Sequence, residues 1–137
     1  MYGDFCCYCE ARIMVTGYKR IEHRKPRSKF LELCYEWTNL HTCCEVCNGN
    51  KGELWNENNP IIDPSIDDPK EHLQFKKSFL LPKNNCLRGK TTIDHVRLNR
   101  EKLEEARRRI LNKMLILILH VNETGGYRKE KIVKKMF

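Results

Sequence analysis

The 137-residue sequence lacks any long hydrophobic run. Its longest apolar stretch, residues 114–119, is far shorter than the roughly 20 residues that a membrane-spanning helix needs. Residues 1–10 lack the apolar segment of a secretory signal peptide, and no internal repeat or low-complexity tract is visible. We therefore expect a cytoplasmic protein without a membrane anchor, in a compartment where cysteines stay reduced.

Acidic residues are also in the minority. Lysine and arginine number 26 against 18 aspartates and glutamates, which gives a formal charge of +8. Basic residues are dense between positions 12 and 29 and again after position 99. Such a distribution favours a polyanionic partner, most commonly nucleic acid, although a solvated basic surface fits the charge alone equally well.

The remaining composition is that of one globular unit. Hydrophobic residues make up 40% and charged residues 32%, and the length suits a single domain. We expect an α+β fold. The expected parts are a core over 6–52, a loop-rich extension over 53–98, and a C-terminal helix with a basic tail over 99–137.

The second half of the chain contains one clear helical pattern. Apolar residues recur at three- and four-residue steps from Leu103 to Val121, which predicts a long helix over residues 99–122. Its wide apolar run indicates burial on more than one side, against the chain's own core, a partner or a second copy. Residues 73–81 fit a short helix or a strand equally well. The remaining signals are Asn99 as N-cap, the pairs Glu104/Arg108 and Glu105/Arg109, and a stop at Gly125-Gly126.

Eight cysteines are the strongest compositional signal. Four of them form two CxxC pairs, and in a reducing compartment such pairs bind metal more often than they form disulfides. Two pairs supply the four thiolates that a structural zinc ion prefers. The expected zinc ligands are Cys6, Cys9, Cys44 and Cys47.

The ligand register has alternatives. Cys7 in place of a neighbour gives CxC spacing and Cys43 gives CxxxC, both less usual, and the sequence leaves them open. Cys34 and Cys86 have no partner at ligand spacing, so we interpret them as core residues or free thiols.

Polar residues suited to hydrolysis lie between the two CxxC pairs. Glu22 directly precedes His23, and Asn39 and Asn48 follow. Cleaving a phosphodiester requires a base for the attacking water and a cation for the developing charge. A carboxylate, an amide oxygen and waters make a ligand set that suits Mg²⁺. A Glu-His pair alone is not specific, because it occurs often on ordinary surfaces.

The order of these motifs resembles the HNH, or ββα-metal, endonuclease finger. The matching elements are CxxC, Glu22-His23 with a proline three residues later, Asn39-Leu40, and CxxC followed by Asn-x-x-Lys-Gly. The resemblance implies that His23 activates water and that Glu22 and Asn48 hold one Mg²⁺ or Mn²⁺. It also implies that Asn39 braces the loop.

A longer set of motifs resembles the PtuB-like branch of HNH proteins, from Septu anti-phage systems and certain retrons. The resemblance implies a nuclease effector beside an ABC-type, PtuA-like ATPase. Its substrate would be DNA or RNA, a tRNA included. The motifs are Tyr8-Cys9-Glu10, Ile21-Glu22-His23, residues 35–40, Asp67-Asp68-Pro69 with His72-Leu73, and Leu98-Asn99-Arg100.

The sequence also suggests roles for the basic residues near the Glu-His pair and for His41, and it allows an alternative function. Basic residues near the Glu-His pair suit phosphate contacts, with solvated surface charge as the alternative interpretation. His41 is either a substitute ligand or a packing residue. The alternative function is a zinc-stapled subunit that binds nucleic acid or protein without catalysis. The expected phosphate contacts are Arg24, Lys25, Arg27 and Lys51.

Overall fold

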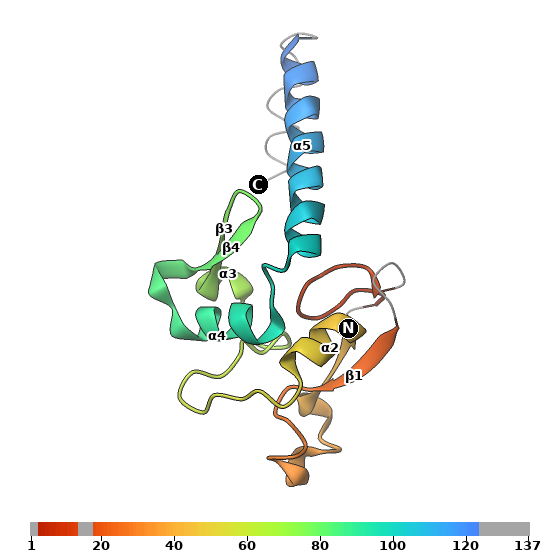
Figure 1. Cartoon of the computed structure of the whole chain (residues 1–137), viewed down its shortest axis with the longest axis vertical. Coiled ribbons are helices and arrows are strands. Elements are labelled where there is room, and N and C mark those ends of the chain that lie inside the picture. The colour runs from red at the N-terminus through yellow and green to blue at the C-terminus, as the bar shows by residue number, and fades with distance from the viewer. Residues whose placement is uncertain (1–2, 14–17, 124–137) are drawn as a thin grey trace.

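The computed structural model describes residues 3–13 and 18–123, and it has a mixed α and β architecture (Figure 1). This agrees with the expected α+β class. The described strands are β1 (Lys19–His23), β2 (Leu40–Cys44), β3 (Leu73–Lys76) and β4 (Phe79–Pro82). The helices are α2 (Glu45–Lys51), α3 (Pro69–His72), α4 (Leu87–Val96) and α5 (Glu101–Glu123), with single 3₁₀ turns over Leu31–Leu33, Trp37–Asn39 and Lys83–Asn85.

The first half is built on a two-stranded antiparallel sheet. Strand β1 pairs with β2 so that Lys19 lies opposite Cys44 and His23 lies opposite Leu40. Helix α2 begins directly after β2, with extended Cys44 as its N-cap residue. The order strand, strand, helix therefore brings the end of β1 close to the residues of α2.

The second half contains a hairpin and helix α4. Residues 73–81, which the sequence left undecided, form the antiparallel pair β3 and β4, with Lys77 at a positive φ of 57° in the turn. Helix α4 was not predicted from sequence. It packs tightly on α3 at Gly89, where a Cβ atom would stand 2.3 Å from the backbone oxygen of His72.

Helix α5 confirms the predicted long helix, but its start differs from the expectation. The carbonyl of Arg100 accepts the first hydrogen bonds, from the amides of Leu103 and Glu104, so Asn99 is not the N-cap. The Asn99 side chain instead binds the backbone of Leu80 at both its amide (2.9 Å) and its carbonyl (2.8 Å). An asparagine side chain can bind the backbone of a strand as well as that of a helix end, and here Asn99 binds strand β4.

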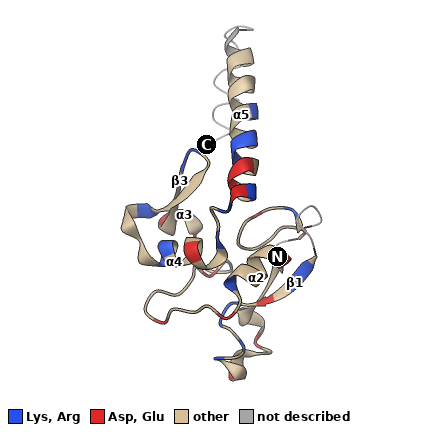
Figure 2. Ribbon diagram, in the orientation of Figure 1, with Lys and Arg blue, Asp and Glu red and all other residues tan. Residues whose placement is uncertain are grey.

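The apolar part of α5 is exposed. Its first turns carry the charged residues, including the ion pairs Glu104–Arg108 and Glu105–Arg109, and the following turns are uncharged (Figure 2). Leu115, Leu117 and Leu119 are 57–60% exposed, and the helix projects from the body (Figure 1). The expectation that this run packs in the chain's own core is wrong for the described residues. The predicted stop at Gly125-Gly126 and the basic tail lie outside them.

The hydrophobic core lies between the cysteine loops, α2, α4 and the segment before α5. It draws on residues from both halves, which joins them into one packed unit. No helix within residues 3–13 and 18–123 is long and apolar enough to cross a membrane. The buried core members include Cys6, Ile13, Cys43, Ile61, Leu80, Ile93, Val96 and Leu98.

Candidate functional site

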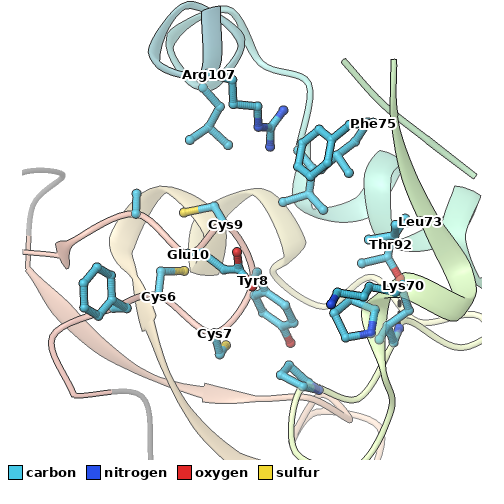
Figure 3. A pocket seen from close by; sticks show the side chains of 18 of the residues that line it. Cys6, Cys7, Tyr8, Cys9, Glu10, Lys70, Leu73, Phe75, Thr92 and Arg107 are labelled. Carbon is cyan, nitrogen blue, oxygen red and sulfur yellow. Dashed lines mark hydrogen bonds between the residues drawn. The ribbon is translucent and has the colours of Figure 1, made fainter. Parts of the chain in front are cut away.

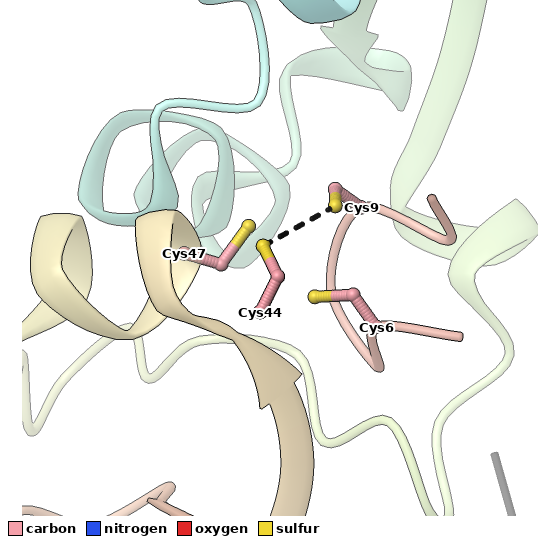
Figure 4. Close-up of side chains that lie close together, drawn as sticks. All are labelled: Cys6, Cys9, Cys44 and Cys47. Carbon is pink, nitrogen blue, oxygen red and sulfur yellow. Dashed lines mark hydrogen bonds between the residues drawn. The ribbon is translucent and has the colours of Figure 1, made fainter. Parts of the chain in front are cut away.

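Four cysteines from the two CxxC pairs converge at one point. The Sγ atoms of Cys6, Cys9, Cys44 and Cys47 all lie within 4.8 Å of one another (Figure 4). The Sγ atoms of Cys9 and Cys44 are 3.9 Å apart, close to the roughly 3.8 Å that a tetrahedral ion with bonds of about 2.3 Å requires. The donor set therefore fits a metal ion, as the spacing predicted.

Local backbone geometry aims these sulfurs inward. The amide of Glu10 donates to the carbonyl of Cys6 (2.9 Å), and Glu10 adopts a left-handed φ of 58°, which closes the first loop tightly. In the second pair, Cys44 caps α2 and Cys47 follows in its first turn. A loop and a helix start thus each present two thiols on one side.

The electrostatics of this cysteine cluster agree with metal binding. The neighbouring thiol of Cys47 lowers the pKa of Cys44 to about 6, and contact with Cys44 lowers the pKa of Cys6 and raises that of Cys9. Sulfurs this close cannot all ionise unless a cation balances them. Arg100 adds positive charge, since its Nη2 donates to the Sγ of Cys47 (3.4 Å).

The other cysteines lie outside the cluster. Among the described residues, Cys7 and Cys43 are not part of it, so the register left open by the sequence is that of the two CxxC pairs. Cys43 is fully buried, and burial raises the pKa of its thiol. Cys86 contacts His72, with Nδ1 and Sγ 3.2 Å apart, and Cys34 lies near His23.

His23 stands at the end of β1 with its ring orientation fixed. Its Nε2 is 2.9 Å from the backbone oxygen of Cys34. A carbonyl oxygen only accepts hydrogen bonds, so Nε2 carries the proton and the Nδ1 lone pair is available as a base. His23 as a whole is half-buried.

Glu22 points to the interior, where its carboxylate is fully engaged. Its side chain is 2% exposed, and its Oε1 is 2.5 Å from the Nζ of Lys51. The Nδ2 of Asn48 donates to Oε2 (2.6 Å), and the Tyr8 hydroxyl lies 3.4 Å from Oε1. Burial raises the pKa of Glu22, and Lys51 and then Asn48 oppose that rise. Glu22, Asn48 and Lys51 form what we call the acid–lysine cluster.

This arrangement does not fit a divalent cation. Both carboxylate oxygens of Glu22 already accept hydrogen bonds, and Asn48 turns its NH₂ group, not its oxygen, toward them. Lys51 supplies the compensating positive charge from within the chain. The two side chains expected to hold Mg²⁺ or Mn²⁺, Glu22 and Asn48, are therefore adjacent, but as placed Glu22 binds the ammonium group of Lys51 and Asn48 donates to Glu22.

Asn39 is buried and ties the loop between β1 and β2 together. Its Nδ2 donates to the carbonyls of Lys25 (3.1 Å) and Leu33 (3.2 Å). Its Oδ1 accepts from the amide of Lys25 (2.8 Å). These bonds hold both ends of the loop that carries Cys34, the residue that orients His23.

Two of the four expected phosphate contacts are engaged inside the protein. Lys51 is 1% exposed, in the acid–lysine cluster. Arg24 forms a buried ion pair with Asp63, with Nε and Oδ2 2.9 Å apart. Both expectations are corrected, because a charge paired in the interior does not reach a phosphate. Lys25 is half-buried over the ring of Phe30, and Arg27 is exposed.

His41 belongs to neither cluster, although it lies opposite Glu22 in the β1–β2 sheet. It is buried, with its Nε2 3.8 Å from the Oδ1 of Asp63. Burial lowers the pKa of His41, and Asp63 opposes that change. Of the two roles left open for it, this position favours packing.

A large cavity, about 940 Å³, lies beside the first cysteine loop (Figure 3). Its walls are mainly apolar and come from the first cysteine loop, the β3–β4 hairpin and the base of α5, where Phe75 and Arg107 approach it. Tyr8 links the two regions, because it lines the cavity and contacts Glu22. Neither Glu22, His23 nor Asn48 lines it, so we do not assign it to the reactive site.

The roles of Lys51 and Arg100 were not predicted from the sequence. Lys51 lies in the Asn-x-x-Lys-Gly motif, one helical turn after Asn48, so i to i+3 spacing could have placed it on the same helix face as Asn48. Arg100 belongs to the Leu98-Asn99-Arg100 motif quoted for the resemblance, yet no local signal connects it to Cys47. Only the tertiary fold brings them together.

The site defines a class of protein: a small mixed α and β unit with four cysteines placed to hold a metal ion and a tautomer-fixed histidine at the end of a strand. No family model matches the chain. Sequence comparison gives 37% identity over 100 residues to Septu protein PtuB of Bacillus thuringiensis, which covers 72% of this chain and 38% of that protein.

Two further relatives agree. The chain is 29% identical to Septu protein PtuB of Bacillus mycoides (95% of this chain, 59% of that protein). It is 23% identical to the "Retron Vc95 putative HNH endonuclease" of Vibrio cholerae (98% and 71%). The chain is thus a relative of the PtuB-like Septu and retron proteins, as its motifs predicted. The matches span 38% and 59% of the two PtuB proteins.

Proposed function

We propose that this protein is an endonuclease that hydrolyses nucleic-acid phosphodiester bonds, with His23 as its general base. The observation that carries the proposal is the 2.9 Å contact between the His23 Nε2 and the Cys34 carbonyl. It fixes the tautomer that a base needs, with the lone pair on Nδ1. The name of the retron relative supports the same chemistry.

In the proposed reaction, the Nδ1 of His23 removes a proton from a water molecule as its oxygen attacks the phosphorus. The new P–O bond forms while the bond to the ester oxygen breaks, and the leaving oxygen takes a proton from solvent. Lys25 and Arg27 hold neighbouring phosphates, a role that positions the strand without reading its sequence. Asn39 acts through the backbone by keeping Cys34 and Lys25 in place.

The cysteine cluster is proposed to hold a structural zinc ion. Four thiolates in a buried tetrahedral set are typical of such sites, and the ion would stabilise the fold that presents His23. It would join the loop of residues 3–13 to α2. Zinc here has a structural role and takes no part in the hydrolysis.

The biological setting is proposed from the relatives' names. The PtuB proteins belong to Septu systems, which supports an anti-phage role in the cytoplasm and a PtuA-like ABC-type ATPase as partner. The substrate is DNA or RNA, with tRNA among the candidates. Because the matches cover part of each PtuB protein, these assignments rest on the shared segment alone.

A second candidate function is a zinc-stapled subunit that binds nucleic acid or protein without cutting. The engaged state of Glu22 favours it, because Lys51 stands where the resemblance implies a divalent cation. This candidate leaves the fixed tautomer of His23 without a purpose, so we rank it second.

The test is cleavage of duplex DNA, single-stranded DNA and total RNA by wild type and His23→Ala. Each reaction is run with Mg²⁺, Mn²⁺ or EDTA at low salt. A positioned general base contributes about 10²- to 10⁴-fold, so the variant should lose at least that much rate with an unchanged melting temperature. His95→Ala, a half-buried histidine with no described contact to the site, is the matched control.

Cleavage by His23→Ala at the wild-type rate would contradict the proposal. If the wild type alone cuts none of the polymers, the same panel is repeated after co-expression with a PtuA-like ATPase. Continued inactivity in that complex would favour the binding subunit.

A further inference from the structure

Two large aromatic side chains next to His23 are left in solvent. Tyr35 is 94% exposed and Trp37 is 75% exposed. Other aromatics of the same region are used for packing. Phe30 and Trp55 meet edge to face with centroids 5.7 Å apart, and both are half-buried. The exposure of Tyr35 and Trp37 is therefore not a general property of this region.

The segment that carries them is held in place by hydrogen bonds. The amide of Glu36 donates to the carbonyl of Leu33 (3.2 Å), and the amide of Asn39 donates to Glu36 (2.9 Å). The Asn39 side chain adds its bonds to Lys25 and Leu33. The two rings are thus presented on a fixed backbone, which lowers the entropy lost when a ligand stacks on them.

Their position connects them to the proposed reaction. Tyr35 follows Cys34, whose carbonyl holds the His23 ring. Trp37 opens the turn that leads to Leu40, the residue opposite His23 in the sheet. Arg27 and Lys29 on the same loop are exposed and form no ion pair within the described residues. Two exposed aromatic rings and two exposed basic side chains therefore lie on the loop whose Cys34 carbonyl holds the histidine ring.

We propose that Tyr35 and Trp37 form a stacking platform for unpaired bases beside the bond that is cut. The inference rests on the proposed nuclease function and names its substrate class, a strand that is single at the cleavage point. Base faces are covered by their neighbours in a duplex, whereas unpaired bases offer a π face to aromatic side chains. Arg27 and Lys29 would bind the phosphates between those bases.

A protein partner would also cover exposed rings, but basic residues exceed acidic ones on this loop (Lys25, Arg27 and Lys29 against Glu32 and Glu36), which favours nucleic acid. Lysine is depleted in protein–protein interfaces, while basic grooves with aromatic rings are the usual means of binding single strands. Leu31, 77% exposed on the same loop, has no π system and provides an internal comparison.

The test measures binding of labelled 20-nucleotide single-stranded DNA, single-stranded RNA and the matching DNA duplex by fluorescence anisotropy. The metal-loaded chain carries His23→Ala throughout, so that no substrate is cut. Loss of one stacking ring should raise the Kd for single strands about 5- to 100-fold. Tyr35→Ala and Trp37→Ala should both do so, with little effect on the duplex. Trp37→Phe should restore most of the binding, and Leu31→Ala should change nothing.

Equal weakening of single-strand and duplex binding would overturn the inference, as would no weakening of either. If the Tyr35→Ala and Trp37→Ala variants lose binding to the ATPase partner but keep nucleic-acid binding, the rings belong to a protein interface. That result would also overturn the inference. Failure of the nuclease proposal alone would give a different result in the cleavage and binding assays. A wild type that binds single strands through these rings but cuts none would retain the platform and lose the catalysis. The DNA and RNA arms identify the polymer.

Discussion

Helix α2 contributes to two buried clusters that balance charge in different ways. Cys44 and Cys47 at its start join the cysteine cluster, and Asn48 and Lys51 further along join the acid–lysine cluster. The thiolates need a cation from outside the chain, whereas the Glu22 carboxylate is neutralised by a lysine of the same chain. One cluster therefore makes the fold depend on a ligand, and the other is complete on folding.

The two clusters also connect different parts of the sequence. The cysteine cluster ties residues 3–13 to α2, segments separated by more than thirty residues. The acid–lysine cluster ties β1 to the helix that follows its partner strand, and Lys51 also donates to the carbonyl of His23 (2.8 Å). The first thus secures the N-terminal loop against α2, and the second sets the position of the proposed base.

Loss of a metal ligand should have the largest effect. Zinc binding in such sites contributes on the order of 10 kcal/mol of folding free energy, so Cys47→Ala should lose its metal and its cooperative unfolding transition. Metal content and circular dichroism on heating measure this. Cys86→Ala, a cysteine outside the cluster, should keep both. A Cys47→Ala protein with one bound zinc per chain and a normal melting curve would disprove the assignment.

Removing the lysine should have the next largest effect. Lys51→Met leaves the Glu22 carboxylate buried without a partner, which costs about 3–5 kcal/mol of unfolding free energy. Urea unfolding of the metal-loaded protein measures it. Unlike Cys47→Ala, this variant should retain its zinc, because the two clusters are balanced independently.

A double variant separates pairing from packing. Glu22→Gln with Lys51→Met removes both charges, so it should lose less stability than the sum of the two single changes. Arg109→Ala, which breaks an exposed pair with Glu105, is the control and should leave the urea midpoint unchanged. Additive losses in the double variant would mean that the buried pair does not act as a unit.

The comparison also shows what the sequence could predict. The cysteine cluster follows from two local spacings, and α5 follows from a repeating pattern, so both were found. The position of Lys51 depends on the tertiary packing of α2 against β1, and no local pattern distinguishes a buried lysine from a phosphate-binding one. The exposure of α5 was missed for a related reason, since periodicity identifies an apolar face but not what lies against it.

The smallest expected effect concerns His41, which lies outside both clusters. Burial lowers its pKa below the ordinary 6.5, while Asp63 opposes and Arg24 and Lys51 assist that change. The unfolded chain then binds more protons than the folded one as the pH falls below about 6.5, so stability should decrease there by at most about 1.4 kcal/mol per pH unit. Urea unfolding between pH 7.5 and 5.5 should show a shallower slope for His41→Gln than for wild type.

His95, whose pKa burial also lowers, accounts for part of the remaining slope of stability against pH. Identical slopes would mean that His41 titrates alike in both states, and that the acid sensitivity belongs to the cysteine cluster, whose thiolates must stay deprotonated to hold a metal.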